Sequence, residues 1–295
     1  MPIQLHQVFN LLFIISLSYY LGYLYLSITS IFFIIIFTFA LDHLLFYIKY
    51  QKRSSRFYSS LITSFGIILM MVSSEIYIYY VVIFLGLLQK YYLTYKEDFE
   101  EVHFFNPSNI ALILGLLLFY DKTHIVIGQL GETLWLKIII IVMATIILLR
   151  AKRVIIPIGF VIFYMISQNV FVIGYDPMLT MEEVYKRFYS VSFIVFILYM
   201  LTDPKTTPNR YVTQLIFALL LAVLSSLLDR YYSFRVQHLF LTLFLLSLFV
   251  PMINYYPNSK KRNKLLSITA ILFFLALSVI ITVESQAPYY FEMDG

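Results

Sequence analysis

The sequence predicts an all-α, polytopic integral membrane protein with about ten or eleven transmembrane helices, some of them short half-helices. Hydrophobic residues make up 61% of the 295 positions and charged residues only 13%, whereas a soluble domain carries roughly 25% charged residues. The apolar residues form long uncharged runs separated by short polar clusters, as expected when each helix satisfies its own backbone polar groups in lipid. The lipid bilayer is therefore the first predicted partner.

The charged residues are arranged as topology signals. The chain has 21 Lys and Arg residues and a formal net charge of +5. They lie in short loops between apolar runs, which favours a role in membrane orientation and argues against nucleic acid as a partner. The chain has no Cys, which excludes disulfides and Cys-held iron–sulfur or zinc sites within it. Because no zinc-binding, phosphate-loop or nucleophile–base motif is present, we predict no catalytic residues and no metal site.

The apolar runs predict eleven spans. The first run, residues 8–48, is about twice as long as one membrane helix of roughly 20 residues, so we expect a hairpin that turns near residues 27–30. The remaining spans are predicted at residues 57–72, 76–88, 110–119, 134–149, 154–174, 188–201, 211–228, 239–250 and 265–283.

The distribution of basic residues predicts the orientation of these spans. Alternating sides from the N-terminus place fifteen Lys and Arg residues on one side and six on the other. The positive-inside rule then puts the N-terminus in the cytoplasm and the tail, residues 284–295, outside the cell (inner) membrane.

Two polar motifs mark the ends of short apolar segments. The segment 110–119 follows Asn106-Pro107-Ser108-Asn109, in which proline suits the first helical turn and the polar side chains can cap it. Asp203-Pro204 precedes the span at 211–228 in a similar way. Helix N-termini attract anionic groups, and short membrane helices require protein or a cavity beside them. Simple capping and a shared polar binding site are both consistent with this pattern.

The order of three motifs resembles a known family. SSLITSFG at 59–66, FFNPSN at 104–109 and YMLTDPKTTP at 199–208 are similar to the D subunit of the Rnf complex (RnfD) and the B subunit of the sodium-pumping NADH:quinone oxidoreductase (NqrB). Stand-alone UnbU-like relatives, found near enediyne gene clusters, are the most similar in character. The resemblance divides the chain into an N-terminal transmembrane hairpin with a basic cytoplasmic loop (1–56), an RnfD/NqrB-like membrane domain (57–256), and a last helix with an external tail (257–295).

The resemblance implies flavin-associated electron transfer coupled to ion transport, beside other membrane or redox subunits. The flavin would be FMN or riboflavin. The cofactor-binding residues that the resemblance implies are Asn106, Pro107, Asn109, Thr133, Thr202, Asp203 and Arg210.

One loop departs from the family pattern. RnfD and NqrB carry FMN covalently on the Thr of a Ser-Gly-Ala-Thr motif that follows an Asp. The corresponding loop here reads IGQLGET at 127–133, which retains a Gly and Thr133 but lacks the Asp, Ser and Ala. A cofactor-free transporter or channel on the same scaffold is therefore kept as the alternative function, and a structural helper of a larger assembly as a third.

Few ionisable groups lie within the predicted spans. Asp42 is expected to pair with Lys49 or Arg53 near the membrane surface, with ion binding as the alternative. His43 and His238 lie in apolar surroundings, where a hydrogen-bonded histidine is commoner than a haem ligand.

Overall fold

The computed structural model describes residues 2–52, 58–97, 100–126, 130–131, 133–175, 180–254 and 259–286. Up to residue 126 the elements are α1 (Ile3–Tyr20), α2 (Ile28–Tyr50), α3 (Tyr58–Met70), β1 (Met71–Ser73), α4 (Ile76–Tyr92), β2 (Thr94–Glu97), β3 (Glu100–His103), α5 (Pro107–Leu118), η1 (Tyr120–Lys122) and β4 (Thr123–Ile125). The later elements are α6 (Leu134–Ala151), α7 (Ile155–Gln168), η3 (Asn169–Ile173), α8 (Met181–Tyr189), α9 (Val191–Val195), η4 (Phe196–Met200), α10 (Tyr211–Tyr231), α11 (Gln237–Ser247), α12 (Val250–Asn254) and α13 (Ser259–Gln286).

The predicted all-α membrane class is confirmed. Each of the eleven predicted spans coincides with helical structure. Within the described residues, five helical stretches are long and apolar enough to cross a membrane: Ile28–Tyr50, Leu134–Ala151, Ile155–Ile173, Tyr211–Tyr231 and Lys264–Gln286. The sequence did not predict α8, because its nine residues are polar on one face and carry no hydropathy signal.

The apolar run at 8–48 forms two helices, α1 and α2, as predicted, but the turn between them lies at residues 21–27 and not near residues 27–30, where α2 already begins. The α2 helix begins directly after Ser27, the last residue of this turn. Ser27 caps it, because the Ser27 hydroxyl accepts a hydrogen bond of 3.1 Å from the Ser30 backbone N–H. Both helices pack against α3 and share its hydrophobic core.

Short helices occupy the middle of the molecule. The α3, α5 and α11 helices have 13, 12 and 11 residues, fewer than the roughly 20 that a membrane crossing needs. The chain continues from α3 into β1, and β4 follows α5 after the short helix η1. These strands pair antiparallel, with Val72 opposite His124. The pairing gives hydrogen-bond partners to backbone groups that a broken membrane helix would leave unsatisfied.

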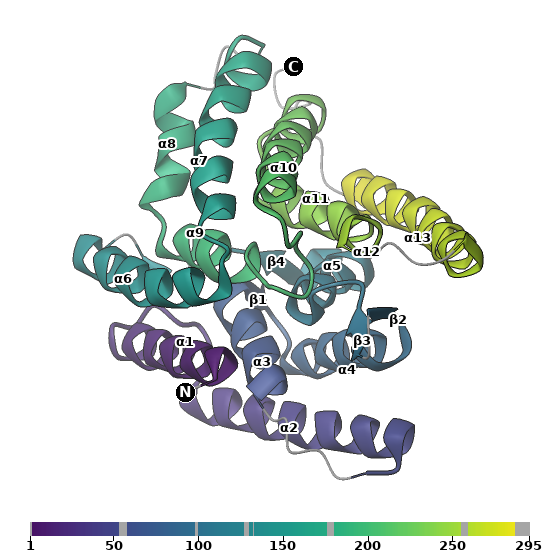
Figure 1. Cartoon of the computed structure of the whole chain (residues 1–295). Helices are drawn as coiled ribbons and strands as arrows, with labels where there is room; N and C mark the ends of the chain where they lie inside the picture. The colour runs from purple at the N-terminus through teal and green to yellow at the C-terminus, as the bar shows by residue number, and fades with distance from the viewer. Residues whose placement is uncertain are drawn as a thin grey trace.

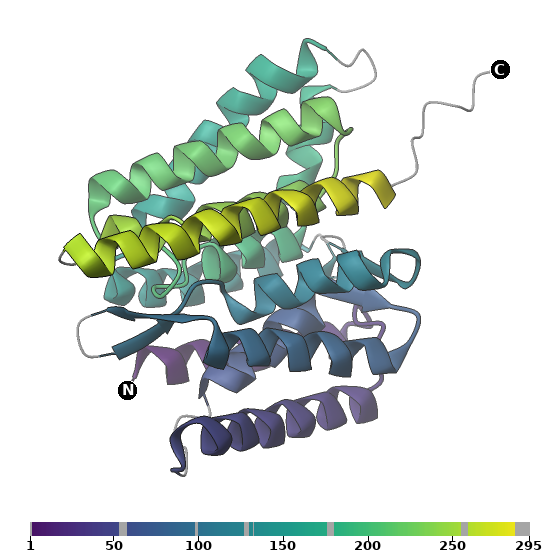
Figure 2. The same ribbon diagram turned by 90° about the vertical axis from the view of Figure 1, so that its right-hand side faces the viewer.

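The helices form two halves around these short elements. Figure 1 shows α1, α2 and α4 on one side and α7, α8 and α10 on the other, with α3, α5 and α9 between them. In Figure 2, α2, α4, α10 and α13 run in broadly similar directions, and the start of α1 and the end of α13 lie at opposite ends of the bundle. If these two ends of the bundle face opposite sides of the membrane, the chain crosses the membrane an odd number of times.

Large apolar side chains cover the outside of the bundle. On α7, Ile158, Ile162 and Ile166 recur every four residues and are each more than half exposed, whereas Phe160 and Tyr164 on the other face are fully buried. Lipid is the solvent that matches such an exposed aliphatic stripe.

The close packing of α4 on α5 can be tested at Gly86. A Cβ atom on Gly86 would lie 2.7 Å from the Pro107 carbonyl oxygen and 3.0 Å from the Ala111 Cβ. Overpacking of this kind costs about 1–3 kcal/mol, so Gly86→Ala is expected to lower the thermal unfolding midpoint of the detergent-purified protein. Gly174→Ala is the control, because nothing lies within 4 Å of its added Cβ. A Gly86→Ala protein as stable as this control would show that α4 and α5 are further apart.

Candidate functional site

Asn106 forms the N-terminal cap of the short helix α5. The Asn106 side-chain oxygen accepts hydrogen bonds from the backbone N–H groups of Ser108 at 2.9 Å and Asn109 at 3.2 Å. Pro107 occupies the first turn of the helix, where its missing N–H costs nothing. The capping predicted from the motif is therefore confirmed.

The same Asn106 side chain also joins the two polar motifs. Its amide nitrogen donates to Asp203 Oδ2 at 3.0 Å, across 97 residues of sequence. The Asp203 carboxylate further accepts from the Lys205 backbone N–H at 3.1 Å and from the Thr206 hydroxyl at 3.3 Å. Asn106 therefore both caps α5 and joins the two motifs, whereas Asp203 caps no helix, because α10 begins only at Tyr211 and has no side-chain cap.

Burial makes the Asp203 carboxyl group unusual. Part of the residue is accessible, but its carboxyl group is enclosed by hydrogen-bond donors. Desolvation raises the pKa of Asp203 above its usual value, even though the hydrogen bond from the Lys205 backbone and the positive charge of Lys205 act in the opposite direction. A carboxyl group with a raised pKa, at the junction of two helix ends, can exchange a proton or bind a small cation.

Asn109 and Thr202 lie beside this junction. The Asn109 amide nitrogen donates to the Phe240 carbonyl at 3.2 Å and so ties α5 to α11, while its side-chain oxygen is buried and has no hydrogen-bond partner among the described residues. Thr202 follows the π-helical turn η4, and its hydroxyl donates to the carbonyl of Leu198 in that turn at 2.6 Å. Five of the predicted residues are therefore gathered around one place: Asn106, Pro107, Asn109, Thr202 and Asp203.

Arg153, rather than Arg210, holds the loop that follows Asp203. Arg210 is exposed at the start of α10 and is not part of the cluster. The Arg153 guanidinium is buried and donates to the Thr207 hydroxyl at 3.1 Å and to the Asn209 side-chain oxygen at 2.6 Å. In the sequence Arg153 is one of three basic residues at positions 150–153, and nothing distinguishes it there from a topology signal.

Two small cavities adjoin the junction. One, of about 20 Å³, is lined by residues that include Gln7, Thr202 and Asp203. The other, of about 30 Å³, is lined by residues that include Gln7, Asn106 and Ser108. A cavity needs roughly 10–15 Å³ to hold a water molecule, so each has room for water or a small ion.

Thr133 lies far from this cluster. It precedes α6, whereas Arg153 follows the same helix; a helix of that length spans about 27 Å at 1.5 Å per residue. The Thr133 hydroxyl lies 2.8 Å from the Tyr23 hydroxyl, and a Cβ atom on Gly131 would lie 2.7 Å from the Tyr23 ring. Residues 127–129 and 132 of the predicted flavin loop lie outside the described residues. In the described part of the loop, Tyr23 packs against Gly131 and Thr133.

The predicted pairing of Asp42 with Lys49 is wrong. Asp42 is buried and its Oδ1 accepts from Lys90 Nζ at 2.7 Å and from the Tyr91 hydroxyl at 2.7 Å. Lys49 instead pairs with Glu101, and this contact lowers the pKa of the Glu101 carboxyl. The predicted span ended at residue 88, whereas α4 continues to Tyr92, and this additional turn brings Lys90 beside α2. Arg53 lies outside the described residues.

The double role of Asn106 can be tested by Asn106→Ala. This change removes a helix cap, worth about 1 kcal/mol, and a donor to a buried carboxyl group, worth about 1–3 kcal/mol. Ser27→Ala is the control, because it removes an exposed cap only. We expect Asn106→Ala to lower the thermal unfolding midpoint in detergent clearly more than Ser27→Ala, and equal losses would show that the Asp203 contact contributes nothing.

The raised pKa of Asp203 predicts how stability depends on pH. A carboxyl group whose folded-state pKa is raised contributes stability below its unfolded value of about 3.9, and this contribution is lost as the pH rises through the folded-state pKa. The unfolding midpoint of the unmodified protein, relative to Asp203→Asn, is thus expected to fall from about pH 4 towards neutrality. The exposed residue Asp121, changed to Asn, serves as the control. An unfolding midpoint of the unmodified protein that rises with pH, relative to that of Asp203→Asn, would contradict a raised pKa of Asp203.

Comparison with known proteins identifies the family. No curated protein matches the chain. A family model described as the NQR2, RnfD, RnfE family matches residues 108–263, more than half of the 295 residues. The matched region begins in the first turn of α5 and includes Asp203 and Arg153, while the motif at 59–66 lies before it. The chain therefore belongs to the NQR2, RnfD, RnfE family.

Proposed function

We propose that the protein is a membrane subunit of a redox-driven complex of the Rnf/Nqr type, in which electron transfer is coupled to ion transport across the membrane. Membership of the family supports the redox part of this proposal. The ion-transport part rests on one observation, the enclosed Asp203 carboxyl group beside two water-sized cavities at the junction of short helices.

The chemistry of the junction suits a proton or a small cation. Oxygen atoms of carboxylate, amide and hydroxyl groups are the usual ligands of such cations. The Asp203 carboxylate and the unpartnered Asn109 oxygen supply atoms of this kind, and the Tyr199 hydroxyl lies further along the wall of both cavities, where it accepts from the Asn10 amide at 3.1 Å. The positive end of the α5 dipole stabilises the negative charge of Asp203 while the cation is absent.

The flavin implied by the family is expected to bind non-covalently. Tyr23 fills the space beside Thr133, and cofactor pockets typically measure roughly 300–1,000 Å³, far more than the cavities at the junction. In the proposal, this chain binds FMN or riboflavin without a covalent bond and exchanges electrons with neighbouring membrane or redox subunits.

The alternative is a cofactor-free transporter or channel on the same scaffold. The packing of Tyr23 against Thr133 favours this alternative. Thr133 corresponds to the residue that carries the flavin in relatives, and here its hydroxyl contacts another side chain of the same protein. The buried polar junction supports ion passage in either case.

The proposed orientation places the N-terminus in the cytoplasm and the C-terminus outside the cell membrane. The excess of basic residues on one side sets this orientation. Polar contacts between distant segments support the alternation of the spans, since each contact joins two residues that the count of spans places on the same side of the membrane. Arg153 reaches Asn209 at the cytoplasmic end, and Arg187 reaches Asp229 at the outer end. Figure 2 agrees, with the start of α1 and the end of α13 at opposite ends.

The absorption spectrum of the detergent-purified protein tests the redox part of the proposal. We expect flavin bands from protein made in flavin-replete cells, and we expect acid precipitation to release the flavin into the supernatant. Thr133→Ala is the matched variant and is expected to retain the same flavin content.

Two other outcomes would contradict parts of the proposal. Flavin that stays with the precipitate, and is lost in Thr133→Ala, would show that the cofactor is covalently attached despite Tyr23. A colourless protein would refute flavin-based electron transfer by this chain and favour the cofactor-free transporter.

A further inference from the structure

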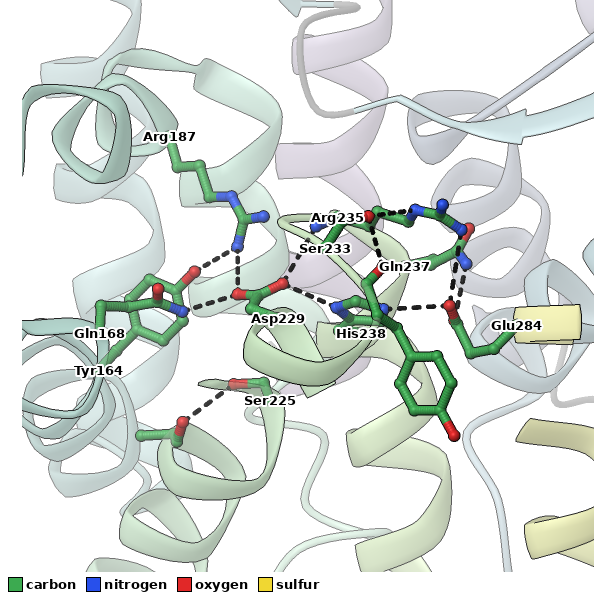
Figure 3. Close-up of polar contacts among 12 residues, drawn as sticks. Tyr164, Gln168, Arg187, Ser225, Asp229, Ser233, Arg235, Gln237, His238 and Glu284 are labelled. Carbon is green, nitrogen blue, oxygen red and sulfur yellow. Dashed lines mark hydrogen bonds and ion pairs between the residues drawn. The ribbon is translucent and has the colours of Figure 1, made fainter. Parts of the chain in front are cut away.

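A second buried polar cluster joins α7, α8, α10, α11 and α13, at the end of the bundle that is proposed to face outside (Figure 3). Its centre is Asp229 of α10, whose Oδ2 accepts from Gln168 Nε2 at 2.7 Å and from Arg187 at 3.1 Å. Asp229 Oδ1 accepts from the Arg235 backbone N–H at 3.1 Å and lies 2.7 Å from His238 Nδ1. Four donors therefore surround this carboxylate and use its acceptor capacity.

His238 lies between two carboxylates. Its Nδ1 faces Asp229, and its Nε2 lies 3.3 Å from Glu284 Oε2, which belongs to α13. A neutral imidazole has one N–H and can offer a proton to only one of these groups, whereas the imidazolium ion has two. The surroundings of His238 thus match its charged form.

The two sides of His238 are not equivalent. Glu284 Oε1 accepts from Gln237 Nε2 at 2.7 Å, but Glu284 Oε2 lies 3.3 Å from His238 and 3.6 Å from Arg235 and has no aligned hydrogen bond. Asp229 therefore fixes the ring, while Glu284 is the carboxylate with acceptor capacity to spare.

The Glu284 side of the cluster is close to the surface. The Arg235 side chain, which covers Glu284, is 17% exposed, and the two residues that follow Glu284 in α13 are exposed. The Glu284 carboxylate therefore lies beside a side chain that reaches the surface of the protein.

Unpartnered polar groups lie near the cluster. The side-chain oxygens of Gln168, Ser226 and Thr242 are buried and have no hydrogen-bond partner among the described residues. Ser226 precedes Asp229 by three residues and Thr242 follows His238 by four, so each lies on the same helix face as a member of the cluster. Gln168 points at Asp229 in Figure 3. Buried polar atoms of this kind bind water, and hydrogen-bonded water carries protons.

The charges of the cluster select the proton over other cations. Three groups are basic: Arg187 and Arg235 as guanidinium ions, and His238 as the imidazolium. They face two carboxylates and also Tyr164, whose hydroxyl accepts from Arg187. A metal cation would be repelled by this excess of positive charge and would find no free oxygen on Asp229.

We propose that His238 is a proton-exchange site at the outer end of the bundle. The Nε2–H bond breaks and its proton passes to Glu284 Oε2, which leaves a neutral imidazole that still donates from Nδ1 to Asp229. The Glu284 carboxylic acid then releases the proton to water at the surface, and a proton from a hydronium ion restores the imidazolium. This site does not depend on the proposed redox function.

Nitrogen NMR of the full chain, labelled with ¹⁵N-histidine in detergent micelles at neutral pH, tests the proposal. We expect both ring nitrogens of His238 to be protonated. We also expect the Nε2 proton to exchange with water roughly tenfold faster than the Nδ1 proton, the factor that one net hydrogen bond contributes. His238→Gln assigns the signal among the five histidines; if that variant does not fold, changing the other four histidines one at a time assigns it by elimination.

Glu284→Gln provides the matched variant, because it keeps an oxygen for Gln237 but removes the proton-accepting charge. In this variant His238 is expected to carry a proton on Nδ1 only, whereas Glu75→Gln, at an exposed position, leaves both protons in place. A singly protonated His238 in the unmodified protein, or two ring protons that exchange equally slowly, would overturn the proposal. Either result would make the cluster a static clamp that fastens α13 to the bundle.

Discussion

The structure depends on one constraint, that backbone polar groups inside a membrane must find hydrogen-bond partners within the protein. Long helices meet this constraint themselves, but α3, α5 and the turn after η4 end within the bundle. Asn106 caps the start of α5, β1 and β4 pair beyond the short helices, and Thr207 donates to the Asp203 carbonyl at 2.7 Å. The candidate site follows from this constraint, because the residues that satisfy the ends of the short helices are polar and lie close together.

The two polar clusters have different designs. Beside the start of α5, a single carboxyl group, Asp203, is held mainly by neutral donors, and small cavities lie beside it. In the cluster around His238, Asp229 and Glu284 are held by guanidinium and imidazole groups. The first arrangement leaves a negative charge for an ion to neutralise, whereas the second already holds its own counter-charges and can exchange only a proton.

Much of the fold could be predicted from local sequence. The apolar runs predicted the helices, and the Asn-Pro motif predicted the cap of α5, because capping and helix breaking are local effects. The meeting of Asn106 with Asp203, 97 positions apart, was only one of two interpretations of the motifs. The partners of Asp42, the role of Arg153 and the cluster around Asp229 were not predictable in this way. These contacts join residues 42 to 61 positions apart, such as Gln168 and Asp229, and a basic residue in a loop looks the same whether it orients the chain or binds a carbonyl.

The contact between Asn106 and Asp203 also sets an order of assembly. The two residues are 97 positions apart, and ribosomes add roughly 5–20 residues each second. A nascent chain therefore holds α5 for roughly 5–20 s before the carboxylate that completes its junction has been made. During that interval Asn106 can already cap α5, but its side-chain amide nitrogen must bind water or lipid headgroups. The first half of the protein is therefore inserted with an incomplete site, which is completed only when Asp203 in the second half has been made.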